Sequence, residues 1–173
     1  MATPQLTGVT FGRWEDVLSR PAPPEQLPIS MMLHHYARGV AHAALGDTEA
    51  ARRELAAMKP YGEKIAEIPA LLDMEPIPVI AEHALQGEIA LRSGDAEGAV
   101  GHFRAAADVE DTMVYIEPPL WYYPIRHSLG VALLEAGRPA EAEQAYRKDL
   151  LKFPGNGWSL YGLAVSLEAQ GKA

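Results

Sequence analysis

Apolar residues recur three and four positions apart along most of the chain, which is the period of an α-helix. No stretch alternates apolar and polar residues in steps of two, so no strand is predicted. The pattern therefore predicts an all-α protein of about eight or nine helices joined by short turns. The helical stretches are Ser30–Leu45, Val79–Leu91, Ala96–Val109, Ile125–Leu134, Ala140–Leu151 and Leu160–Leu167.

Helix-breaking residues fall between these stretches and seldom inside them. The chain has 14 Pro and 15 Gly, and most prolines lie in three groups, within residues 21–28, 60–78 and 118–124. Pro139 precedes a helical stretch directly, where its missing N–H costs nothing. The many prolines and glycines thus mark the joints between helices.

Three stretches, which begin at Gly39, Gly87 and Gly130, share one spacing of small and large residues. This spacing predicts a helical hairpin. The first glycine lets the two helices of a unit approach closely, and the second ends the first helix in a left-handed conformation. A small alanine faces the first helix, and a large residue fills the gap between successive hairpins. The matching positions are Gly46, Gly94 and Gly137, then Ala51, Ala99 and Ala142, then Leu55, Phe103 and Tyr146.

This pattern resembles the tetratricopeptide repeat family, whose 34-residue unit has the same order of small and aromatic positions and a closing proline. The third copy has that proline as Pro154, and a fourth copy begins one period later with Ala164 in place of the first glycine. The stretch Gly12–Leu18 is similar to the turn and second helix of an earlier copy. The resemblance implies an α–α superhelix, a solenoid of helical hairpins.

We expect a single repeat domain over residues 1–173, with two insertions because the copies are more than one period apart. The apolar spacing of Ile65, Ile68, Leu71 and Leu72 predicts a short helix in the first insertion. The half units at the two ends suggest a piece of a longer array, or an array capped by half repeats. The expected parts are a half repeat at 8–21, repeats at 30–62, 78–111 and 123–154, insertions at 63–77 and 112–122, and a terminal helix at 156–170.

Charge and composition exclude several classes of partner and of chemical site. Fifteen Lys and Arg against 23 Asp and Glu give a net charge of −8, which argues against nucleic acid or an anionic membrane as partner. The absence of cysteine excludes disulfides, thiolate metal sites and cysteine nucleophiles. No apolar run approaches the ~20 residues that span a bilayer, and no signal-peptide layout begins the chain. We therefore expect no membrane insertion and a cytoplasmic location.

In the family that the chain resembles, ligands usually lie in the concave groove lined by the first helix of each hairpin. The alternative is that part of this face only packs helices together. The register places no lysine or asparagine on this face, so we do not expect a clamp for the carboxylate at the end of a peptide. An apolar or mildly basic segment would suit the groove better. The predicted groove residues are Tyr36, Val40, Glu88, Leu91, His127, Val131, Leu134 and Tyr161.

The second insertion carries the most distinctive segment, EPPLWYYP over residues 117–124. Its prolines stiffen it, and its aromatic residues offer a large amphipathic surface. As a recognition loop or lid it would use Glu117, Trp121, Tyr122 and Tyr123. The alternative, which we favour, is that the aromatic side chains pack between the second and third copies, because three exposed aromatics are costly.

No catalytic or metal site is predicted. The six histidines are scattered, no nucleophile lies near a base, and the glycine pairs do not follow strands. Trp14, Trp121 and Trp158 are interpreted as packing residues. We therefore predict no cofactor and no enzyme activity.

The leading hypothesis is a module that binds a peptide or partner protein in its groove. The alternative is a structural segment of a longer array that stacks on neighbouring repeats or self-associates through its half-repeat ends.

Overall fold

The computed structural model describes residues 3–114, 116–117 and 119–172, with the side chains of Thr3, Ala70, Leu72 and Asp73 left out. All regular structure in these residues is helical, which confirms the predicted all-α class. The elements are α1 (Thr3–Thr10), α2 (Trp14–Ser19), α3 (Pro28–Ala44), α4 (Thr48–Ala66), the 3-10 helix η1 (Pro69–Met74), α5 (Pro76–Arg92), α6 (Ala96–Thr112), α7 (Arg126–Glu135), α8 (Pro139–Lys152) and α9 (Gly157–Glu168).

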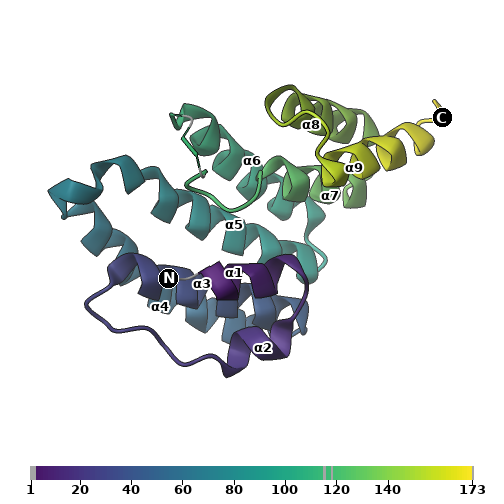
Figure 1. Ribbon diagram of the computed structural model, residues 1–173. Coiled ribbons are helices and arrows are strands. Elements are labelled where there is room, and N and C mark those ends of the chain that lie inside the picture. The colour runs from purple at the N-terminus through teal and green to yellow at the C-terminus, as the bar shows by residue number, and fades with distance from the viewer. Residues whose placement is uncertain (1–2, 115, 118, 173) are drawn as a thin grey trace.

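The helices pack as consecutive pairs (Figure 1). The most extensive contacts join α3 to α4 and α5 to α6, and α8 contacts both α7 and α9. The pairs follow one another in space in chain order, from α1 and α2 at the N-terminal end to α9 at the C-terminal end (Figure 1). The predicted solenoid of helical hairpins is confirmed.

The turn inside each hairpin depends on the second glycine of the repeat. Gly46 has φ of 86°, a left-handed conformation that costs glycine little, and its N–H donates to the carbonyl of Ala43. The next residue, Asp47, begins α4 by accepting a hydrogen bond from the N–H of Ala50 at 2.9 Å. Gly94 and Gly137 have the same sign of φ, at 82° and 70°. The predicted role of the second glycine is confirmed.

The first glycine of the repeat plays two different parts. At Gly87, an added Cβ would lie 2.8 Å from the Phe103 ring of the same hairpin, as expected. At Gly39 the expectation is wrong, because the close neighbour is Leu85 of α5 in the next hairpin, 2.6 Å from such a Cβ. The reason lies at Leu55, which stands where Phe103 does and is smaller and only half-buried.

Two regions differ from a plain repeat. In the first insertion, α4 continues to Ala66 and η1 follows before α5 begins, while the side chain of Leu72 lies outside the described residues. At the N-terminal end, α1 precedes α2, and the apolar pattern did not predict it. Val17 of α2 is buried against Ala37 and Ala41 of α3, so the first two helices are joined to the stack.

Candidate functional site

The first helices of the three hairpins, α3, α5 and α7, do not stack evenly. Helix α5 packs directly on α3, whereas α7 packs on α6, and residues 113–124 of the second insertion lead from α6 into α7. A pocket of about 440 Å³ opens beside this loop, and we call it the groove pocket. It is lined by Val9, Thr10, Trp14, Tyr36, Val40, Glu88, Leu91, Arg92, Tyr122, Tyr123, Pro124, His127, Ser128, Val131, Asn156 and Trp158.

The structure brings six of the eight predicted groove residues to this one pocket: Tyr36, Val40, Glu88, Leu91, His127 and Val131. Leu134 is absent from the lining and packs against the core. Tyr161 is also absent from it and lies exposed on α9.

The predicted loop residues divide between core and pocket. Trp121 is only 4% exposed, and its ring meets that of Tyr36 edge-on with the centroids 5.2 Å apart. Tyr122 and Tyr123 are half-buried and line the groove pocket, while Glu117 is exposed and does not. As a result Tyr36, a predicted ligand contact, is itself 1% exposed. The loop thus covers one part of the groove and forms a wall of the remainder.

The tryptophans do not all pack as the sequence suggested. Trp121 does, but Trp158 is 64% exposed at the start of α9 and lines the groove pocket, so its interpretation as a packing residue is wrong. Trp14, on α2, packs partly on the core and also lines the pocket. Asn156 caps α9 by accepting a hydrogen bond from the Trp158 N–H, and this fixes the start of the helix and so the position of Trp158 in its first turn. An aromatic residue two positions after such a capping residue was the available signal.

Three tyrosine hydroxyls lie in the covered part of the groove. The hydroxyls of Tyr36 and Tyr122 are 3.2 Å apart, and that of Tyr123 is 3.2 Å from the Ser128 hydroxyl. Burial raises the pKa of all three tyrosines, and the nearby charge of Glu88 adds to this. The hydroxyls therefore stay neutral and can donate or accept hydrogen bonds.

Glu88 is the acidic group of the groove pocket. Its side chain is 17% exposed, and its nearest cation is the Arg92 side chain, with Nε 3.8 Å from the carboxylate. Burial raises the pKa of Glu88, while the charge of Arg92 acts in the opposite direction.

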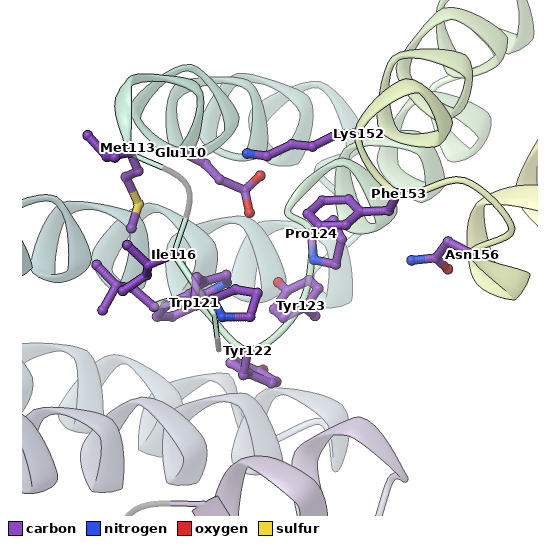
Figure 2. A pocket seen from close by; sticks show the side chains of 13 residues that line it. Glu110, Met113, Ile116, Trp121, Tyr122, Tyr123, Pro124, Lys152, Phe153 and Asn156 are labelled. Atoms are coloured by element: carbon purple, nitrogen blue, oxygen red, sulfur yellow. The ribbon is translucent and has the colours of Figure 1, made fainter.

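A smaller cavity of about 140 Å³ shares Tyr122, Tyr123, Pro124 and Asn156 with the groove pocket (Figure 2). Figure 2 shows Glu110 and Lys152 across this cavity from Trp121 and Tyr123. The Glu110 carboxylate is buried and accepts a hydrogen bond from the backbone N–H of Ile125 at 3.2 Å. Burial raises its pKa to about 7. The indole N–H of Trp121 is buried and has no hydrogen-bond partner among the residues that the structure describes. Sequence reasoning did not single out Glu110.

The histidines form polar contacts that the sequence did not predict. The Nδ1 atoms of His83 and His102 are 3.3 Å apart on facing helices, and His127 lies 3.3 Å from the Asp149 carboxylate. Ser159 donates to Asp149 and not to His127, so these three residues lack the nucleophile–base contact of a hydrolase. Within the described residues, no group of three or more His, Cys, Asp or Glu side chains could hold a metal ion.

In the part of the chain that the structure describes, no helix is long and apolar enough to cross a membrane.

In the comparison with protein families, residues 32–57 and 124–148 match the family model described as tetratricopeptide repeat. These segments correspond to the first and third predicted copies. No curated protein and no solved structure matches the chain.

Proposed function

Since residues 32–57 and 124–148 are tetratricopeptide repeats, which are in general protein–protein interaction modules, we propose that this protein binds a segment of a partner polypeptide in the groove pocket. The proposal treats it as a non-catalytic module without a cofactor. One observation carries it. A single pocket of about 440 Å³ is lined from α1, α2, α3, α5, α7, the inserted loop and the start of α9.

The chemistry of the lining supports a peptide over a small polar metabolite. Leu91, Val131 and Trp158 provide apolar surface, while tyrosine and serine hydroxyls and Asn156 provide hydrogen-bonding groups at its edge. A few polar groups in a mainly apolar cleft are typical of sites that bind side chains and fix their orientation. A volume of about 440 Å³ suits a few side chains of a longer segment.

The test is selection from a random peptide library, followed by isothermal titration of the selected peptides. Val131 is 44% exposed in the pocket, so Val131→Lys should weaken binding at least about tenfold, because it replaces apolar lining with a charge that binding would withdraw from water. The matched control is Leu151→Lys, because Leu151 is 85% exposed on α8 and absent from the pocket. If Leu151→Lys abolished binding and Val131→Lys did not, the partner would bind the outer helices and the proposal would fail.

A second candidate is self-association, which exposed apolar residues at the C-terminal end favour. Leu151 on α8 and Leu160 and Tyr161 on α9 are all exposed. Such a cluster buries apolar surface when two copies meet. Light scattering over a range of concentrations tests it. A dimer that dissociates in the double variant Leu160→Asp, Tyr161→Asp would support this candidate, and a monomer at all concentrations would remove it.

A further inference from the structure

The Glu88 carboxylate is weakly paired in the groove pocket. Within the described residues its closest charged partner is Arg92, and its side chain is 17% exposed. Its contact with Arg92 is 3.8 Å long, beyond hydrogen-bond distance, and the Arg92 side chain is 49% exposed. The carboxylate is thus only partly withdrawn from water and weakly paired, and a cationic donor that reached it could make a charge-assisted hydrogen bond.

Aromatic rings line the same pocket as this carboxylate. Trp14 and Trp158 contribute from α2 and α9, and Tyr122 and Tyr123 contribute from the inserted loop. The faces of such rings attract cations, most strongly when the cation is partly withdrawn from water. A carboxylate among aromatic rings therefore favours a positively charged group that has an apolar stem.

We infer that the groove pocket receives a basic side chain of the partner segment, arginine or lysine, with its charged head at Glu88 and its stem among the aromatic rings. The inference rests on the proposed function and specifies its ligand. The net charge of −8 acts in the same direction, because it attracts basic segments from a distance. Both basic residues have the long apolar stem that such a pocket can bury.

Arg92 makes the inference sharper, because it competes for the same carboxylate. It stands one helical turn after Glu88, and its guanidinium is the nearest cation to it. An incoming basic side chain would displace it toward solvent, where half of its surface already lies. Removal of Glu88 and removal of Arg92 should therefore change the affinity in opposite directions.

The experiment uses capped pentapeptides, Ac-Ala-Leu-Arg-Leu-Ala-amide and versions with lysine, norleucine or glutamate in the centre. Binding is followed by NMR through the indole N–H signals of Trp14 and Trp158, which line the pocket. The arginine and lysine peptides should bind about tenfold more tightly than the norleucine peptide. Glu88→Gln should remove this difference, and Arg92→Met should tighten binding of the basic peptides about threefold.

The matched control is Glu49→Gln, which makes the same charge change at an exposed pair with Arg52 on α4. It should leave the affinities unchanged. Equal binding of the arginine and norleucine peptides to the wild-type protein would overturn the inference. The proposed function would then still be decided by the effect of Val131→Lys on the library-selected peptides, so the two failures are distinguishable.

Discussion

The two places where one hairpin meets the next along α5 are built in opposite ways. At the first junction, α3 packs directly on α5, and Leu85 fills the space that a side chain at Gly39 would need. At the second junction, between α5 and α7, Trp121 of the inserted loop packs on Tyr36, and Tyr122 and Tyr123 form part of the wall of the groove pocket. Beside Gly39 the first junction is closed, although a pocket of about 510 Å³ opens farther along it, lined by Met32 of α3, Met58 of α4 and Val79 of α5 among others. At the second junction the aromatic loop fills part of the gap, and the groove pocket occupies the remainder.

The two junctions also differ in polarity. Beside Gly39 the first junction is closed by the aliphatic side chain of Leu85, and the Lys59–Glu82 ion pair across it is partly exposed. The second buries Glu110, three tyrosine hydroxyls near Glu88, and a Trp121 indole N–H that has no hydrogen-bond partner among the described residues. Each imperfectly satisfied polar group costs stability. The insertion therefore gives up some packing free energy at the second junction and leaves a pocket whose lining includes hydrogen-bonding groups and a carboxylate.

The largest expected effect comes from removal of the aromatic wedge. Trp121→Ala should lower the free energy of unfolding by about 3–5 kcal/mol, because a large buried side chain leaves a cavity that the junction cannot close completely. Urea unfolding measures the loss, and hydrogen exchange should show the largest loss of amide protection in α7, which follows the loop.

Trp158→Ala is the matched control for Trp121→Ala, since it makes the same change at a ring that is 64% exposed. Its cost should stay below about 1 kcal/mol. If the two variants lost equal stability, Trp121 would not hold the second junction together.

An intermediate effect is expected at the first junction. Gly39→Ala would place a Cβ 2.6 Å from a terminal carbon of Leu85, which is fully buried and has little room to move. Overpacking should cost about 2 kcal/mol, measured by urea unfolding, even though alanine is the better helix former.

Gly101→Ala supplies the control, because Gly101 also lies within a helix and an added Cβ there has no neighbour within 4 Å. This variant should gain about 0.5–1 kcal/mol from helix propensity alone. A gain at both positions would mean that α3 and α5 can separate without cost, and the contrast between the junctions would disappear.

The sequence was sufficient for the hairpins because their determinants are local. Gly46 must adopt positive φ to end α3, and Asp47 must cap α4, whatever surrounds them. The register of the repeat then brings Glu88, Leu91 and Val131 toward one pocket.

The sequence was insufficient wherever the outcome depends on contacts between hairpins. Nothing near Gly39 reveals that Leu85, 46 positions away, takes the space that Leu55 leaves. In the same way, the composition of the loop does not show whether it covers the groove or stays free in solvent. The answer depends on whether Trp121 contacts Tyr36, which lies 85 positions earlier in the chain. Trp158 was misjudged because a tryptophan is usually buried, while its place at the start of α9 keeps it exposed.

The smallest expected effect tests the polarity of the second junction through the pH dependence of stability. The pKa of Glu110 is about 7 in the folded protein, against an ordinary value of 4.5. Between these pH values the folded protein binds the proton more tightly than the unfolded chain, so stability should fall as pH rises from about 4.5 to about 7. Glu110→Gln should remove most of this slope. It should also raise stability at pH 8 by about 1 kcal/mol, because it removes a charge that burial disfavours while the amide oxygen still accepts the hydrogen bond of Ile125. The new N–H donors of the amide keep this gain small. Thermal unfolding across this pH range, with Glu49→Gln as the exposed control, measures it. An unchanged slope in Glu110→Gln would show that this carboxylate does not titrate within the folded junction, and that the second junction is less costly than its buried polar groups imply.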